Sequence, residues 1–114
     1  MNIPSKYWDF LTRLVTGSEI VIDRPKGSAH PRYPDFVYPL DYGYLKNTRS
    51  SDGDEVDVWL GSLNDKNING IICTADIEDR DVEIKLLLGC TIEEIVMIID
   101  IHNQGTQAAF FIAH

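Results

Sequence analysis

The chain has 114 residues, of which 44% are hydrophobic and 25% are charged, as in an ordinary globular protein. A chain of this length encloses one hydrophobic core, so we expect a single domain spanning residues 1–114. The sequence contains no run of about 20 apolar residues that could cross a bilayer, and residues 1–9 lack the pattern of a secretion signal. These features predict a cytoplasmic protein with no membrane partner.

The charge is strongly negative, because 18 acidic residues face 10 basic ones and give a net charge of −8. Such a field repels phosphate backbones, so no nucleic-acid partner is expected. Half of the acids fall in two short windows: Asp52, Asp54, Glu55 and Asp57, then Asp76, Glu78, Asp79, Asp81 and Glu83. Two interpretations remain open, namely solvated turns or carboxylates that converge on a divalent cation.

The first half of the chain predicts one helix, one strand and an extended connector. Over residues 5–16, Trp8, Leu11 and Val15 recur at spacings of three and four, and a glycine follows. Residues 19–23 are rich in β-branched side chains and predict a strand. Three prolines in the connector, residues 26–39, with Pro25 just before it, exclude regular helix there.

The second half predicts more strands and a second helix. Residues 56–60 alternate as a strand with two different faces, and residues 68–76 and 81–88 form a predicted hairpin. Thr91 is suited to cap a helix that runs to about Ile101. The predicted fold class is α+β: a small closed or partly closed β-barrel with an N-terminal and a C-terminal helix.

The cysteines and the later histidines carry little functional signal. Cys73 and Cys90 lie among apolar residues and are expected to be buried free thiols. His102 and His114 are expected to be exposed to solvent. Lys85, by contrast, lies within an apolar strand and needs a partner there, which an acidic side chain would supply.

The strongest local signal is the acidic segment 52–57, Asp-Gly-Asp-Glu-Val-Asp. It places three aspartates within six residues, and Gly53 allows the sharp turn that aims several oxygens at one point. An EF-hand loop does not fit, because its fifth position would be Val56 and helices do not flank the segment.

This segment and its neighbours resemble the family I soluble inorganic pyrophosphatases. Residues 38–44, Tyr-Pro-Leu-Asp-Tyr-Gly-Tyr, lie eight positions before an acidic segment that resembles the family signature D-G-D-P/E-hydrophobic-D. Residues 22–28 resemble the family segment E-I-P-x-G-S, with Asp23 at the acidic position, and residues 83–85 resemble D-x-K. The resemblance covers roughly residues 20–88.

The resemblance implies a five-stranded OB-type barrel that hydrolyses pyrophosphate to two orthophosphates with Mg²⁺, or alternatively Mn²⁺. It implies Asp54, Asp57 and Tyr42 as catalytic residues, with Asp54 as the general base for the attacking water. The implied substrate ligands are Arg32, Lys85 and Tyr42. The implied metal ligands are Asp52, Asp57, Asp76, Glu83 and Asp23.

The sequence also departs from the family pattern. The family's K-x-E strand is missing between Ser28 and Arg32, and the late Tyr-Lys pair is missing near the end of the chain. The alternative function is therefore a catalytically weak barrel that binds metal and phosphate, or a hydrolase of another phosphate compound. The apolar tail, residues 108–113, would expose a patch and predicts a homo-oligomer.

Overall fold

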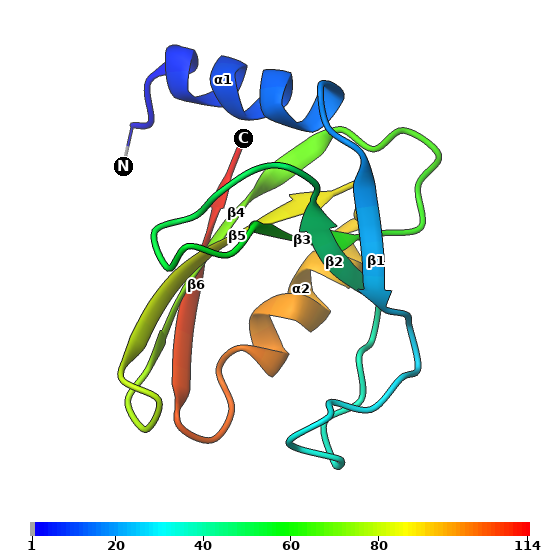
Figure 1. Ribbon diagram of the computed structural model, residues 1–114, viewed down its shortest axis with the longest axis vertical. Helices are drawn as coiled ribbons and strands as arrows, with labels where there is room; N and C mark the ends of the chain where they lie inside the picture. Colours follow the sequence, from blue (N-terminus) through cyan, green and yellow to red (C-terminus); the bar gives the residue numbers. More distant parts are fainter. Residues whose placement is uncertain (1) are drawn as a thin grey trace.

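The strands form one mixed six-stranded sheet in the order β1-β2-β3-β5-β4-β6 within residues 2–114, which the computed structural model describes (Figure 1). The elements along the chain are α1 (Ser5–Thr16), β1 (Ile20–Arg24), β2 (Asp41–Leu45), β3 (Val56–Leu60), β4 (Ile68–Asp76), β5 (Asp81–Leu88), α2 (Ile92–Ile101) and β6 (Gln107–Ala113). Strands β3 and β5 run parallel, and the other neighbours are antiparallel. Strands β1 and β6 are the two edges, so hydrogen bonds do not close the sheet.

The sheet has a hydrophobic core on each face. Helix α1 contributes Trp8 and Leu11 to one core, where they pack with Leu86, and helix α2 contributes Ile98 to the other, where it packs with Leu87. Because consecutive side chains of a strand point to opposite faces, neighbouring leucines of β5 fill different cores. Strand β5 is therefore apolar at every position near its end. Neither helix described in residues 2–114 is long and apolar enough to cross a membrane.

Both helices and the central hairpin lie where the sequence predicts them. Helix α1 has the predicted bounds, and the Gly17 N–H donates to the Arg13 carbonyl at its end. Helix α2 begins with a capping box, because Thr91 Oγ1 accepts from the Glu94 N–H at 3.2 Å and Glu94 Oε1 accepts from the Thr91 N–H at 2.8 Å. Hairpin β4–β5 also has the predicted bounds.

The number of strands was predicted wrongly, and the second helix is not the last element of the chain. The resemblance implied five strands, and the residue pattern predicted a C-terminal helix, but α2 is followed by a sixth strand, β6. The apolar tail that was interpreted as a surface patch pairs with β4 over its whole length, with Phe111 opposite Ile72. Its alternate side chains turn inward, while Phe110 stays 54% exposed.

Cys73 and Cys90 are free thiols, as predicted, although only Cys90 is fully buried and Cys73 is half-buried. Burial raises the pKa of the Cys90 thiol to about 12. This thiol therefore stays protonated near neutral pH and is unreactive.

His102 is buried, and the expectation that it faces solvent was wrong. Only 6% of its surface is exposed. Its Nε2 accepts a hydrogen bond from Trp59 Nε1 at 3.1 Å, so the ring proton resides on Nδ1, which donates to Gln107 Oε1 at 2.8 Å. Burial lowers the pKa of His102, so the ring is neutral in the folded protein. This histidine joins β3 to β6 across the core under α2.

We expect His102→Leu to lower the free energy of unfolding by about 1–3 kcal/mol at pH 7.5, because the Trp59 indole N–H loses its buried acceptor. The difference from wild type should shrink at pH 5.5. In the unfolded wild type His102 takes up a proton below about pH 6.5, whereas in the folded protein its lowered pKa opposes this. The contribution of His102 to wild-type stability therefore decreases as the pH is lowered from 7.5 to 5.5. Urea unfolding at both pH values checks this, and a difference that widens in acid would contradict it.

Candidate active site

A buried lysine, Lys85, is the centre of the candidate site. Its Nζ lies 2.7 Å from the Tyr42 hydroxyl, 3.1 Å from Asp57 Oδ2 and 3.3 Å from Glu83 Oε2. Only 6% of Lys85 is exposed, whereas the side chains of Asp57 and Glu83 are each 29% exposed. Lys85 thus has two acidic partners, Asp57 and Glu83, where one was expected, and both carboxylates remain accessible to solvent.

Three strands bring these residues together on the α2 face of the sheet. Glu83 and Lys85 alternate along β5 in phase with the buried Leu87, and Asp57 alternates along β3 in phase with Trp59. Tyr42 of β2 lies opposite Trp59 in the ladder, and their rings pack edge to face with centroids 4.7 Å apart. The parallel β3–β5 pair places Trp59 beside Leu87, and therefore Asp57 close to Lys85.

The electrostatics of this group favour a charged lysine beside a neutral tyrosine. Burial alone would lower the pKa of Lys85, but Tyr42, Asp57 and Glu83 together raise it above its ordinary value. Burial raises the pKa of the Tyr42 hydroxyl, and the nearby Lys85 only partly offsets this. Burial also raises the pKa of Glu83. The group holds two carboxylates and one ammonium, so it carries a net charge of −1 at neutral pH.

Asp52 and Asp54 lie in the loop between β2 and β3 and begin the segment that leads to Asp57. Asp52 Oδ1 accepts hydrogen bonds from Ser50 Oγ at 2.6 Å and from the Asp54 N–H at 2.9 Å. The Ser50 hydrogen bond is the main cause that lowers the pKa of Asp52, and the charge of Lys85 also contributes. Asp52 orders the loop, and Asp54 is exposed to solvent.

Asp76 ends β4 and organises the hairpin turn. Its Oδ1 accepts from the N–H groups of Glu78 at 3.0 Å and Asp79 at 2.9 Å, and from Thr106 Oγ1 at 3.0 Å. The Asp79 hydrogen bond is the main cause that lowers the pKa of Asp76. The side chain therefore ties the β4–β5 turn to the connection that precedes β6.

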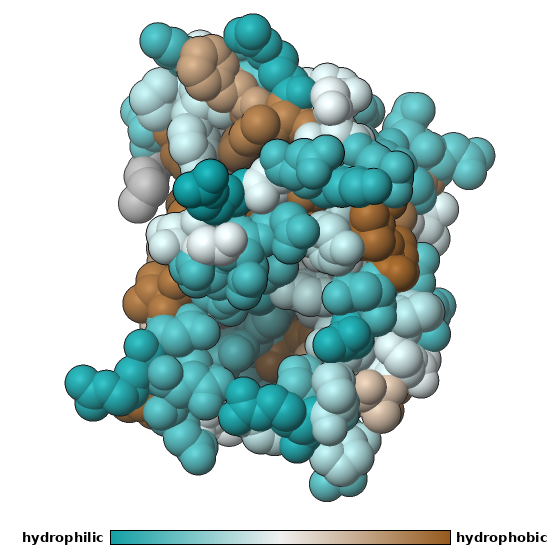
Figure 2. All heavy atoms as spheres, viewed as in Figure 1, coloured by the Kyte–Doolittle hydropathy of each residue, from teal (hydrophilic) through white to brown (hydrophobic). Residues whose placement is uncertain are grey.

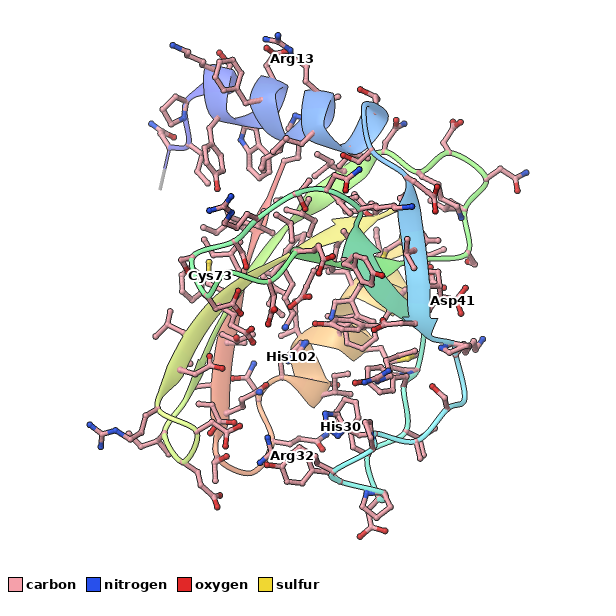
Figure 3. All side chains as sticks on the ribbon, viewed as in Figure 1. Arg13, His30, Arg32, Asp41, Cys73 and His102 are labelled. Carbon is pink, nitrogen blue, oxygen red and sulfur yellow. The ribbon has the colours of Figure 1, made fainter. Side chains whose placement is uncertain are left out.

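Asp23 and Arg32 lie outside the Lys85 group. Asp23 Oδ2 is 3.7 Å from the guanidinium of its neighbour Arg24. Arg32 extends over the Tyr33 ring, 5.5 Å from its centroid, and Figure 3 shows it near His30 at the end of the molecule opposite α1. Over residues 2–114, no three His, Cys, Asp or Glu side chains gather closely enough to hold an ion.

Sequence reasoning missed the aromatic layer under the site. Tyr38 packs against Tyr42, with ring centroids 5.5 Å apart, and against Trp59, at 5.8 Å. His102 binds the far side of Trp59. The density of tyrosines in residues 38–44 was the available signal, but their contact with residues 59 and 102 depends on the fold. In the view of Figure 2 the surface has a hollow near its middle, bordered mainly by hydrophilic residues.

The family model described as inorganic pyrophosphatase matches residues 19–77, about half of the chain. The chain belongs to this family. The matched segment contains Asp23, Arg32, Tyr42, Asp52, Asp54, Asp57 and Asp76, whereas Glu83 and Lys85 follow it.

A curated relative, the inorganic pyrophosphatase of Leifsonia xyli, is 37% identical over a segment that covers 40% of this chain and 37% of the relative. The match therefore spans little more than a third of that protein. The acidic segment 52–57 that resembles the family signature lies within the residues that the family model matches.

Solved structures share the fold. An inorganic pyrophosphatase from Neisseria gonorrhoeae superimposes with a TM-score of 0.57 at 23% identity, covering 78% of this chain and 77% of that one. One from Coxiella burnetii gives 0.58 at 13% identity, with 82% of both chains covered. One from Helicobacter pylori gives 0.56 at 17% identity, covering 82% and 81%. The predicted OB-type fold of this family is confirmed.

Proposed function

We propose that the protein hydrolyses inorganic pyrophosphate to two orthophosphates and depends on Mg²⁺. Family membership supports the reaction class. The observation that carries the proposal is the convergence of Asp57 and Glu83 on one buried positive charge, beside a tyrosine hydroxyl. Phosphoryl transfer needs this kind of site, because it depends more on positioning and charge neutralisation than on covalent help from the protein.

The residues fit a divalent cation. Two carboxylate oxygens lie within 3.3 Å of one positively charged atom, Lys85 Nζ, so the backbone already aims them at a cation position. Mg²⁺ is commonly held by only one or two protein carboxylates together with substrate phosphates, and Mn²⁺ accepts the same oxygen ligands. Asp57 and Glu83 are the ligands that the geometry supports best.

We assign the remaining metal ligands from the family pattern. Asp52 lies in the loop that leads into β3, the strand that carries Asp57, and the charge of Lys85 contributes to lowering the pKa of Asp52. Asp76 has one oxygen engaged in the hairpin turn, which leaves the other for an ion. Asp23 is the next-to-last residue of the edge strand β1 and is the most peripheral ligand of the set.

Each protein group has a distinct task in the reaction. Mg²⁺, when bound, neutralises phosphate charge and lowers the pKa of a water molecule. Asp54 accepts a proton from the attacking water, whose oxygen bonds to phosphorus while the bridging P–O bond breaks and the second phosphate leaves. Tyr42 and Lys85 orient phosphate oxygens, and Arg32 reaches them from the connector loop. The aromatic layer holds Tyr42 in place.

We also propose a cytoplasmic homo-oligomer built from one domain, residues 1–114. Exposed apolar side chains on the α1 face of the β4–β5–β6 part of the sheet support association. Ile84 and Phe110 both lie beside Cys73 in the ladders, and Val82 is the next residue of β5 on that face. Pyrophosphate, or a related small phosphate compound, is the proposed partner at the site.

An orthophosphate release assay tests the function. We expect release from pyrophosphate only with Mg²⁺ or Mn²⁺, and a KM raised well above micromolar levels because the family's K-x-E segment is missing between Ser28 and Arg32. A nucleoside triphosphate and a phosphate monoester are the parallel substrates. Faster release from either would favour a hydrolase of another phosphate compound, and metal-dependent binding of pyrophosphate without release would favour the catalytically weak barrel.

A further inference from the structure

We propose that the Lys85 ammonium is an internal substitute for the divalent cation. In the metal-free protein it neutralises Asp57 and Glu83, and binding of the cation to these carboxylates releases Lys85 to bind phosphate. The inference rests on the proposed function for the identity of the two ligands, but it concerns how Lys85 couples them.

The number of hydrogen bonds at Lys85 is the first argument. An ammonium group has three N–H donors. Lys85 Nζ has three acceptors within 3.3 Å, namely the hydroxyl of Tyr42 and the carboxylates of Asp57 and Glu83. All its donors are therefore occupied, and a phosphate oxygen can be bound only if one of these hydrogen bonds is given up.

The accessibility of the partners is the second argument. Lys85 has 7% of its side chain exposed, against 29% for each of its carboxylate partners. An incoming cation therefore meets Asp57 and Glu83 before it meets the ammonium. It approaches them from the solvent side, whereas Lys85 reaches them from within the sheet.

The change in charge is the third argument. With Lys85 alone, the two carboxylates give the group a net charge of −1, which repels phosphate. Addition of a divalent cation makes the net charge +1, which attracts it. Metal and phosphate must then strengthen each other's binding, because the coupling between two ligands is reciprocal.

The first test measures Mn²⁺ affinity without phosphate in wild type and in Lys85→Met. Methionine fills the volume of the buried lysine stem without its charge, and the two carboxylates that lose their partner are each 29% exposed, so water can solvate them. We expect Lys85→Met to bind Mn²⁺ about tenfold more tightly or better, because no internal cation competes. The matched control, Lys6→Met on α1, removes the same charge at an exposed position and should change the affinity less than about twofold. Equal or weaker binding by Lys85→Met would overturn the proposal.

A second measurement uses the wild type alone. It distinguishes displacement of Lys85 from the carboxylates by the metal ion from simple charge repulsion between Lys85 and the ion. The buried, paired ammonium protons should give a resolved ¹H–¹⁵N signal in the metal-free protein. Saturation with Mg²⁺ should shift or broaden this signal as the carboxylate bonds break, and added orthophosphate should shift it again. A Lys85 signal that is unchanged at saturating Mg²⁺ would overturn the exchange.

These readouts are independent of catalysis. If pyrophosphate is hydrolysed but Lys85→Met leaves Mn²⁺ affinity unchanged, the exchange is wrong and the function stands. If Lys85→Met tightens Mn²⁺ binding and the wild-type signal responds as described, but no hydrolysis is seen, the exchange stands and the proposed reaction is wrong.

Discussion

Asp57→Asn is expected to lower pyrophosphate hydrolysis by about 10³-fold or more, because it removes a carboxylate proposed to bind the metal that neutralises the transition state. The fold should survive. Asparagine has the shape of aspartate, its amide oxygen can still accept from Lys85, and Glu83 remains to pair with the ammonium. Rates at saturating Mg²⁺, with thermal melts of both proteins, provide the measurement.

Asp79→Asn is the matched control, with the same change in charge and volume. Asp79 is exposed in the β4–β5 turn, and only its backbone N–H has a structural role, as a donor to Asp76. We expect activity within about twofold of wild type, as for most surface substitutions. Equal activity in the Asp57 and Asp79 variants would remove Asp57 from the proposed site.

Gly43→Ala is expected to lower the free energy of unfolding by about 3 kcal/mol. Gly43 lies in β2, between Ile22 of β1 and Val58 of β3. A Cβ at this position would lie 1.8 Å from the Val21 carbonyl oxygen and 2.9 Å from the Ile22 Cα. Both obstacles are backbone atoms, so strands β1 and β2 would have to separate. Chemical denaturation measures the loss, and the neighbouring Tyr42 would move with the strand.

Gly105→Ala is the comparison, since its cost has a different origin. Gly105 has φ of +62°, and a Cβ there meets no atom within 4 Å. The only cost is the left-handed backbone conformation, about 1 kcal/mol. If the two variants lost equal stability, the close approach of β1 and β2 at Gly43 would be wrong.

Local signals in the sequence were sufficient for much of the fold. The spacing of Trp8, Leu11 and Val15 predicted α1, and Thr91, a residue suited to cap a helix, marked the start of α2. The β4–β5 hairpin was also predicted, because its two strands and its acidic turn are adjacent in the chain. Each of these features depends on neighbours within a few residues.

The features that were missed depend on distant contacts. Strand β6 and a loop-exposed apolar tail have the same composition, and only pairing with β4 distinguishes them. His102 is buried because Trp59, 43 positions earlier, donates to it. In the site, the position of Lys85 within an apolar strand predicted that it needs an acidic partner. The sequence did not indicate that Asp52 and Asp76 each accept backbone hydrogen bonds that order a turn. The roles of Arg32 and Asp23 stay predictions.

The parallel pairing of β3 with β5 has a consequence for how the protein acquires its site during folding. The β1–β2–β3 meander and the β4–β5 hairpin can each form from contacts close in sequence, and such contacts form fastest. Tyr42 and Asp57 belong to the first unit, and Glu83 and Lys85 to the second. The docking of β5 against β3 joins the two units, and it is therefore also the step that brings Lys85 to its carboxylate on the other unit. A partly folded chain holds every residue of the cluster and yet has no site.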